Sequence, residues 1–440
     1  MKKILNQFFA PILNQDEDKI SQCKKSTILK KGARYFDFTA SGLAFSPIQK
    51  RLASFLPYYA NTHSDTSTHA TITTALYKHS KEVIKECLGL GEEFSLLNVG
   101  SGSTGAIKLF QELMGIYIPP KTKEILKLGE VKNLPWVFVG AYEHHSNEIS
   151  YREGLCNLQR ISLNNEGLLD LQELKEGVKN ANGKIIGSFN VASNVTGIIT
   201  PYNEVSEILR SKNAIVAFDM ASSSPYMNVP SHIFDACFLS PHKLLGGVGS
   251  CGLLGIKSSL IDTSIAPTFG GGGTIKNANR TTHEYLQNID YRQEAGTPGI
   301  IQLLTAALAY QLRNEVGLEL IHQRERVLIQ VMMHELKSIP ALTLYGNTEA
   351  DRLGVFSFNV GGVSPFDLAL ELSEKYGIQT RSGCSCAGPY GYDLFGLEDS
   401  ASELGMKPNW IRVSVHYTHG VEDIEYFILS LKKAIKKLRV

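Results

Sequence analysis

Residues 214–225 read AIVAFDMASSSP, a short apolar run that ends at Asp219 and then turns polar. The segment before it, YNEVSEILRSKNA (202–214), spaces its apolar residues as a helix does. Before that helix, KIIGSFNVASNVTG (184–197) is another apolar run ending in polar residues. Strand, helix and strand in succession predict a parallel α/β sheet.

The same plan extends to both sides of this unit. PWVFVGAYEHHSN (135–147) precedes it and FDACFLSPHKLLGG (234–247) follows it. Ligands of such sheets bind beyond the carboxyl ends of the strands. We therefore expect one crevice to collect the polar residues that end these runs: His144, Asn194, Asp219 and Lys243.

The chain has 440 residues, more than one hydrophobic core usually serves, so two domains are expected. Composition changes after FGGGGT (269–274), and a long helical pattern starts after Gly299. Shorter strand candidates follow, LTLYG, VFSFNV and WIRVSVHY, mixed with a helical stretch. A second, smaller α+β domain is predicted over 299–440.

Charge and cysteine content exclude several classes of protein. The net charge of +1 gives no reason to expect nucleic acid or an anionic membrane as a partner. Seven cysteines, an odd number, do not suggest a disulfide framework, so a reducing cytoplasm is the expected location. The N-terminal MKKILNQFFAPIL resembles a signal peptide, but polar residues interrupt it, and no apolar stretch is long enough to span a bilayer.

The glycine-rich stretch GSGSTG (100–105) follows an apolar run and precedes a helical one. It matches the dinucleotide fingerprint, but the acidic residue expected after a second strand is missing. A turn of this kind at a helix N-terminus still offers free N–H groups and the hydroxyls of Ser103 and Thr104 to a phosphate. A plain strand-to-helix turn is the alternative interpretation.

Lys243 and Asp219 are candidates for cofactor chemistry. A lysine at a strand end is costly to bury unpaired, and Schiff-base chemistry uses such a lysine. Ser240 and His242 beside it could contact a phosphate. Asp219 either caps the following turn or faces a buried cation such as the pyridinium nitrogen of pyridoxal phosphate. Taken alone, Lys243 would more often be exposed and Asp219 more often a cap.

The histidine pair His144 and His145 could ligate a metal, but no second cluster has convincing ligand spacing. We therefore predict no metal site. An imidazole stacked on a planar cofactor and moving protons fits the strand end better.

The loop TRSGCSCAGPYG (380–391) holds Cys384 and Cys386. In an extended loop their Cα atoms would lie about 7 Å apart, at or beyond the limit for a disulfide, so no bridge between them is expected. A zinc site lacks partner ligands, so small filler residues or a reactive thiol remain as interpretations.

The motifs GSGSTG, EHHSN, ASNVTG, FDMA, SPHK, EAGTPG and RSGCSCA occur in this order. Together they resemble the class V (fold type I) pyridoxal-phosphate enzymes, most closely the cysteine desulfurase and selenocysteine lyase branch, over about residues 35–430. The resemblance implies a mainly parallel seven-stranded sheet flanked by helices, with a pyridoxal-phosphate domain over 35–298. The smaller C-terminal domain over 299–440 would carry the cysteine loop, and residues 1–34 would pack on it.

The resemblance also implies a role for each matching residue. Lys243 would form the Schiff base, Asp219 would pair with the ring nitrogen and His144 would stack on the ring. Phosphate contacts would come from Ser103, Thr104, Ser240 and His242, and from Thr297 reaching the partner subunit's site, which implies a homodimer with shared sites. The substrate contacts would be Asn194, Arg381 and Arg412, with Asn194 also touching the cofactor.

Cys386 falls where this family keeps its sulfur-accepting nucleophile, although two family histidines are replaced by Cys384 and Ser385. A second departure is Ser222, where the family usually has Gln or His contacting the cofactor's phenolic oxygen. The implied reaction removes sulfur or selenium from L-cysteine or L-selenocysteine, gives L-alanine and leaves a Cys386 persulfide, with a sulfur-acceptor protein as a further partner. Other class V reactions (transamination, epimerisation, cysteine β-elimination) and a degenerate scaffold remain alternatives.

Overall fold

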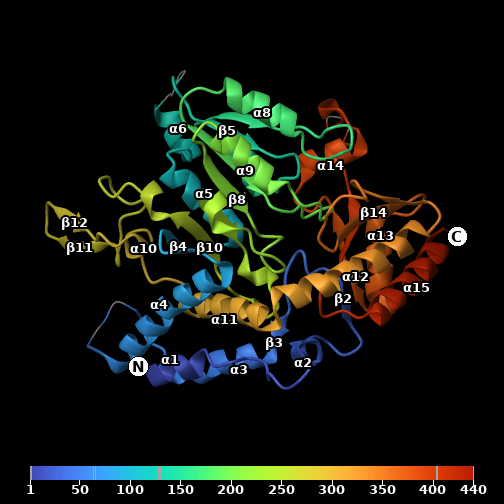
Figure 1. Cartoon of the computed structure of the whole chain (residues 1–440), viewed down its shortest axis with the longest axis horizontal. Helices are drawn as coiled ribbons and strands as arrows, with labels where there is room; N and C mark the ends of the chain where they lie inside the picture. The colour runs from blue at the N-terminus through green and yellow to red at the C-terminus, as the bar shows by residue number, and fades with distance from the viewer. Residues whose placement is uncertain (1, 63, 65, 127–130, 403–404, 440) are drawn as a thin grey trace.

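The computed structural model describes residues 2–62, 64, 66–126, 131–402 and 405–439. Its centre is a seven-stranded sheet, visible edge-on among the green and teal helices of Figure 1. Along the sheet the strands are β4 (Phe94–Val99), β10 (Gly252–Lys257), β9 (Ala236–Leu239), β8 (Ile215–Asp219), β7 (Ile185–Asn190), β5 (Trp136–Val139) and β6 (Asn157–Arg160).

Five of these strands are parallel neighbours, and β10 alone in this sheet runs antiparallel to both of its neighbours. The predicted α/β fold with a mainly parallel seven-stranded sheet is therefore confirmed. Because β9, β8, β7, β5 and β6 point the same way, their carboxyl ends meet at one edge. That edge is where the predicted polar residues were expected to collect.

Both faces of the sheet are buried, and the strands show it residue by residue. In β8, Val216 and Phe218 belong to one core while Ala217 between them belongs to another. Successive side chains of a strand point to opposite faces, so a continuous apolar run is what such a strand requires. The first core is covered by α4 (Thr68–Leu88), α8 (Leu171–Asn180), α9 (Tyr202–Arg210) and α11 (Ile300–Val316), and the second by α5 (Gly102–Leu113) and α7 (His145–Arg152).

The C-terminal part has a core of its own. A four-stranded antiparallel sheet packs there with three helices, seen in orange and red in Figure 1. Its strands are β13 (Leu342–Leu344), β14 (Val355–Val360), β17 (Trp410–Ser414) and β16 (Arg381–Gly383), and its helices are α12 (Leu318–Lys337), α13 (Pro365–Tyr376) and α15 (Val421–Leu438).

The long helical pattern after Gly299 is two helices rather than one. α11 ends and α12 begins at Gly317, whose φ of +96° is left-handed and outside the helical range. A residue with a side chain would be strained there, so glycine marks the change of direction. The break lets α11 pack on α4 while α12 crosses to the C-terminal core.

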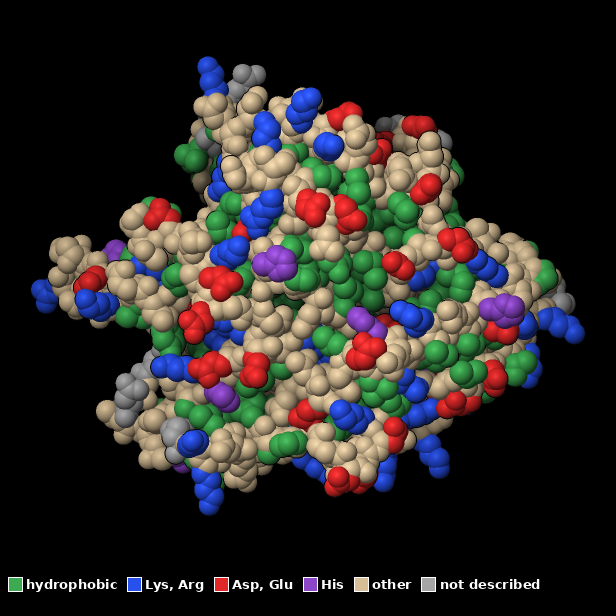
Figure 2. Space-filling model, viewed as in Figure 1, with side chains coloured by type: hydrophobic (Ala, Val, Ile, Leu, Met, Phe, Trp, Pro, Cys, Tyr) green, Lys and Arg blue, Asp and Glu red, His purple; other side chains and the backbone are tan. Residues whose placement is uncertain are grey.

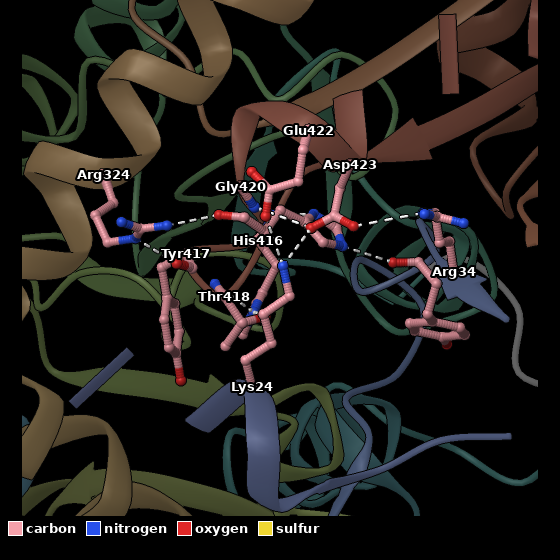
Figure 3. Close-up of polar contacts among 11 residues, drawn as sticks. Lys24, Arg34, Arg324, His416, Tyr417, Thr418, Gly420, Glu422 and Asp423 are labelled. Carbon is pink, nitrogen blue, oxygen red and sulfur yellow. Dashed lines mark hydrogen bonds and ion pairs between the residues drawn. The ribbon is translucent and has the colours of Figure 1, made fainter. Parts of the chain in front are cut away.

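The N-terminal segment contacts the large core and the helix α15 of the C-terminal part. It contains α1 (Lys2–Phe8) and α2 (Lys19–Ser26), and Phe8 and Cys23 are buried in the large core. Lys24 and Arg34 pair with Asp423 of α15 (Figure 3). From α12, Arg324 donates to the backbone carbonyls of Tyr417 and His419 in the same cluster. The predicted boundaries at residues 35 and 299, and the placement of residues 1–34 on the small domain, stay predictions.

The remaining elements are short. α3 (Ser46–Phe55) follows the paired strands β1 (Thr27–Ile28) and β3 (Ala44–Phe45), and the projecting hairpin of β11 (Ile275–Ala278) and β12 (His283–Tyr285) stands out in Figure 1. The others are α6 (Pro120–Leu126), α10 (Ile289–Arg292), α14 (Gly388–Phe395), and β2 (Arg34–Tyr35) paired with β15 (Ile378–Gln379). Positive and negative side chains are mixed over the face drawn in Figure 2. Among the described residues, no helix combines the length and apolar character needed to cross a membrane.

Candidate active site

A cavity of about 240 Å³ lies at the carboxyl edge of the large sheet. Residues of the large sheet's edge and residues of the C-terminal antiparallel sheet both line it. It brings together nearly all of the predicted site residues. The predicted residues lining it are Ser103, Thr104, His144, Asn194, Asp219, Ser222, Ser240, His242, Lys243, Arg381, Cys386 and Arg412. Thr297 does not line it; it is exposed on another loop, where Asn61 Nδ2 donates to its hydroxyl at 3.2 Å.

One end of the cavity is built from the N-terminus of α5. The Ser103 N–H donates to Ser240 Oγ at 2.9 Å, which ties the start of the helix to the end of β9. Gly102 has a φ of +56°, and a Cβ there would lie 3.0 Å from Ser240 Oγ and 3.1 Å from His242 Cε1. A bulkier residue would fill this end, so glycine keeps it open. Free N–H groups and hydroxyls at a helix N-terminus favour an anion.

Lys243 and Asp219 face the middle of the cavity. Burial lowers the pKa of Lys243 to about 8, although the nearby Asp219 carboxylate opposes that shift. Burial also raises the pKa of Asp219, against a 2.9 Å hydrogen bond from the Ala221 N–H to its Oδ1 and the charge of Lys243. Only the backbone of Ala221 bonds to this carboxylate among the described residues, so Oδ2 is free for a cation. Asp219 therefore caps the following turn with Oδ1, as the alternative interpretation held, and Oδ2 stays available for a cation.

His144 is held in one orientation at the start of α7. Its Nδ1 accepts the Ser146 N–H at 3.2 Å, which places the ring proton on Nε2. Burial, with Lys243 nearby, lowers the pKa of His144 to about 4, so the ring is neutral at physiological pH. The preceding Glu143 is fully buried and accepts the Asn190 N–H at 2.9 Å, which fixes the end of β5 against β7.

Asn194 lies on the loop that follows β7, and Ser222 lies on the loop that follows β8. Asn194 Oδ1 is buried and has no hydrogen-bond partner within the described chain, although its Nδ2 donates to the Ser385 carbonyl at 2.8 Å. An unpaired buried polar atom in a cavity indicates a missing ligand. Ser222 lines the same cavity and is buried, with a side chain shorter than the Gln or His that the family usually has at this position.

The sequence interpretation missed Asp37, which connects the two arginines. Its Oδ2 accepts from Arg381 Nε at 3.0 Å and its Oδ1 from Arg412 Nη2 at 2.9 Å. Arg381 and Arg412 are directly opposite in neighbouring strands β16 and β17, where like charges repel. The carboxylate offsets this repulsion and leaves the cluster with one net positive charge.

The two arginines are not equivalent. Arg412 is buried, and its Nη1 and Nη2 are both occupied, by the Asn194 carbonyl and by Asp37. The side chain of Arg381 is half exposed, and its two Nη groups have no partner among the described residues. Arg381 therefore presents the free fork that suits a carboxylate.

Thr39 is a second residue that was missed. Its side chain is buried at the cavity wall, and Oγ1 has no hydrogen-bond partner within the described residues. The only signal in the sequence was a run of small residues after the aromatic-rich YFDF (35–38). Ser101, Ala40, Asn190 and Ala192 also line the cavity and were not predicted.

The cysteine loop is a tight turn, so the expectation of an extended loop was wrong. Ser385 and Cys386 have φ values of +54° and +57°, and the Ala387 N–H donates to the Cys384 carbonyl at 3.1 Å. A hydrogen-bonded turn with two left-handed central residues is of type I′. Helical geometry at Ser385 places the two cysteine Cα atoms about 5.4 Å apart, inside the range for a disulfide. Both thiols are free in this structure, and Cys386 is the more exposed.

Comparison with known proteins identifies the family. The family model described as aminotransferase class-V matches residues 34–427. The chain belongs to this family. A probable cysteine desulfurase of Pyrococcus abyssi is 28% identical over 94% of this chain and 98% of its own length. A cysteine desulfurase of Serratia proteamaculans is 28% identical over 81% of this chain and 84% of its own length.

A solved structure of similar shape is the apo cysteine desulfurase of Thermococcus onnurineus, with a TM-score of 0.80 and 26% identity. The matched region spans 95% of this chain and 98% of the Thermococcus chain. The predicted resemblance and the fold are thereby confirmed. Class-V aminotransferases are pyridoxal-phosphate enzymes, and the predicted cofactor of this chain is confirmed with its family.

The residues of the cavity fit this cofactor. The N-terminus of α5 suits the phosphate, and the free Oδ2 of Asp219 suits the pyridinium nitrogen. The neutral ring of His144 and the unpaired Oδ1 of Asn194 both face the space between these ends. Lys243 would hold the aldehyde carbon.

The pKa of Lys243 predicts how cofactor uptake depends on pH. Only the neutral amine binds an aldehyde, and a pKa of about 8 means that half of the side chains are neutral near pH 8. We expect the rate of pyridoxal-phosphate uptake by cofactor-free protein to rise from pH 6.5 to 8.5 and to level off above about pH 9. Absorbance of the bound cofactor measures it. A rate that did not change between pH 7 and 9 would contradict the assignment.

The contrast between the arginines predicts different variant behaviour. Arg381→Ala removes the free fork, so we expect the KM for an amino-acid substrate to rise about 10- to 100-fold, as for a lost charged hydrogen bond. Arg381→Ala also removes one partner of Asp37, but the Arg381 side chain is half exposed, so the thermal midpoint should fall less than in Arg412→Ala. Arg412→Ala leaves Asp37 buried with one partner fewer, and we expect a loss of about 3 kcal/mol in unfolding free energy. Steady-state kinetics and thermal unfolding of both variants check this, and equal behaviour would refute the distinction.

Proposed function

We propose that this protein is a cysteine desulfurase, which converts L-cysteine to L-alanine and transfers the sulfur to Cys386. L-selenocysteine would be a second substrate of the same chemistry. The observation that carries the proposal is the position of Cys386, an exposed thiol at the wall of a cavity that also holds Lys243 and Arg381. The relatives named as cysteine desulfurases support it.

Each residue has a task that its geometry supports. The Nη groups of Arg381 bind the substrate carboxylate, and the buried Arg412–Asp37 pair holds the neighbouring strand and Arg381 in place. Lys243 Nζ moves protons at the substrate carbons, since its lowered pKa lets it act as base and acid near neutral pH. When bound, pyridoxal phosphate supplies an electron sink for the carbanion that forms next to the amine.

Cys386 takes the sulfur. Its Sγ forms a bond to the substrate sulfur as the bond from that sulfur to Cβ breaks, and Cβ gains a proton. Overall, L-cysteine and the Cys386 thiol give L-alanine and a Cys386 persulfide, so atoms and electrons balance without an added oxidant. A sulfur-acceptor protein would then remove the sulfur from this exposed side chain.

The experiment that tests the proposal is a single-turnover reaction. Protein loaded with pyridoxal phosphate is mixed with L-cysteine, alanine is quantified, and the peptide carrying Cys386 is examined by mass spectrometry under acid quench. One alanine per site is expected, with the substrate sulfur recovered either as a persulfide on this peptide or as sulfide released from it. Pyruvate and ammonia in place of alanine would indicate β-elimination, and conversion of an added keto acid would indicate an aminotransferase.

We also propose a homodimer with shared active sites. Thr297 is exposed outside the cavity of its own chain, and Phe269 of the same region is 73% exposed, which supports burial of this segment against a second copy. The free state of all seven cysteines supports a reducing, cytoplasmic location. Sedimentation velocity of the loaded protein tests the dimer.

A further inference from the structure

Cys384 is the one thiol near the active site to which the proposed reaction assigns no task. It begins the type I′ turn whose third residue is Cys386, and Ser385 lies between them. Its side chain is half-buried and packs against the large core, whereas Cys386 is exposed. A half-buried thiol is a poor target for molecules in solution, but it stays within reach of a neighbour two residues away.

The turn is held in place from outside the loop. Asn194 Nδ2 donates to the Ser385 carbonyl at 2.8 Å, and the His145 N–H donates to the Cys386 carbonyl at 2.8 Å. Trp410 Nε1 donates to Ser385 Oγ at 3.2 Å. Each left-handed residue that is not glycine costs about 1–2 kcal/mol, so these bonds maintain a conformation that the loop alone would not favour.

The conformation has a chemical consequence for the two thiols. An extended Ser385 would separate the cysteine Cα atoms by about 7 Å, but the left-handed one brings them to about 5.4 Å. Disulfides span about 4.4–6.8 Å between Cα atoms, so rotation about the χ1 angles can join the sulfurs. A bridge in such a short ring is strained, and strained disulfides are readily reduced.

We propose that Cys384 is the resolving thiol of this site and releases the transferred sulfur as sulfide; this rests on the proposed desulfurase function. The Cys384 thiolate attacks Sγ of the Cys386 persulfide. The bond from Sγ to the outer sulfur breaks, and that sulfur leaves with the electron pair and with the proton that it already carries, as hydrosulfide. The outer sulfur is reduced by two electrons as the two cysteines are oxidised to a disulfide. A dithiol reductant then restores both thiols.

The test uses loaded, fully reduced protein without free reductant, given one equivalent of L-cysteine per site and quenched with acid and an alkylating agent. In the unaltered protein we expect one sulfide per alanine and a peptide lighter by two hydrogens, with neither cysteine alkylated. In Cys384→Ser the peptide should be heavier by one sulfur at Cys386, and sulfide should fall about tenfold or more until a dithiol is added. Cys156→Ser, a matched half-buried thiol away from the cavity, should behave as the unaltered protein.

The outcomes separate this inference from the function on which it rests. Alanine together with a lasting Cys386 persulfide and an alkylated Cys384 in the unaltered protein overturns the resolving role alone. A sulfur found on Cys384 also overturns it and indicates transfer between the thiols. If no alanine forms, the desulfurase function fails and this inference with it. A further arm does not need turnover: glutathione disulfide should give the internal disulfide in the unaltered protein but only a mixed disulfide in Cys384→Ser.

Discussion

Lys243→Ala loses pyridoxal-phosphate absorbance and at least about 10³-fold of alanine formation, because one side chain both holds the cofactor and moves the protons. Among the described residues that line the cavity, Lys243 alone carries an amine, so no neighbour replaces it. Absorption spectra and single-turnover alanine yields measure the two losses. Lys212→Ala, an exposed lysine beyond the cavity, is the matched control and should keep both.

The loss in Lys243→Ala will not come from unfolding. The folded pKa of Lys243 is lowered to about 8, below its ordinary value of 10.5, so the folded state binds this proton less readily than the unfolded state. The charged side chain therefore destabilises the cofactor-free protein below pH 8, and that cost disappears as pH rises from 8 to 10.5. Alanine removes the cost, so the thermal midpoint at pH 7 should not fall. A variant that keeps full activity would remove Lys243 from the chemistry.

The sheet edge could be predicted because it depends on local patterns. Asp219 and Lys243 follow apolar runs, and the carboxyl ends of parallel strands meet at one edge whatever their order along the sheet. The antiparallel direction of β10 could not be predicted, because GGVGSCGLLG (246–255) reads as one more apolar run with a glycine-rich start. Direction depends on the connection between strands, not on the composition of either one.

The interactions that shape the substrate side of the cavity are long-range. Asp37 meets Arg381 across 344 residues and Arg412 across 375, so no local pattern announces either pair. The turn at Ser385 and Cys386 was missed for a related reason. Left-handed backbone usually goes with glycine, and here hydrogen bonds from Asn194, His145 and Trp410 impose it on other residues. Such contacts exist only after the large sheet and the C-terminal part of the chain have packed together.

Cys386→Ser should lower alanine formation about 10³-fold or more while pyridoxal-phosphate absorbance stays unchanged. The thiol is held at the cavity wall by its turn, and a positioned nucleophile can be worth an effective concentration up to about 10⁵ M. Serine keeps the shape and the left-handed backbone of residue 386 but is a much weaker nucleophile toward sulfur. Cys384 should not take over, because it does not line the cavity where the substrate would bind.

The cofactor spectrum separates this loss from a damaged site. Asp219 ends β8 and Lys243 lies in the short helical turn after β9, both far along the chain from residue 386, so Cys386→Ser should bind pyridoxal phosphate with the affinity of the unaltered protein. Adding a small thiol in excess should restore part of the alanine formation, because a solution thiolate can accept the sulfur in place of residue 386. Full alanine formation by Cys386→Ser without added thiol would show that the sulfur leaves by a route other than Cys386. Pyruvate and ammonia in place of alanine would indicate β-elimination.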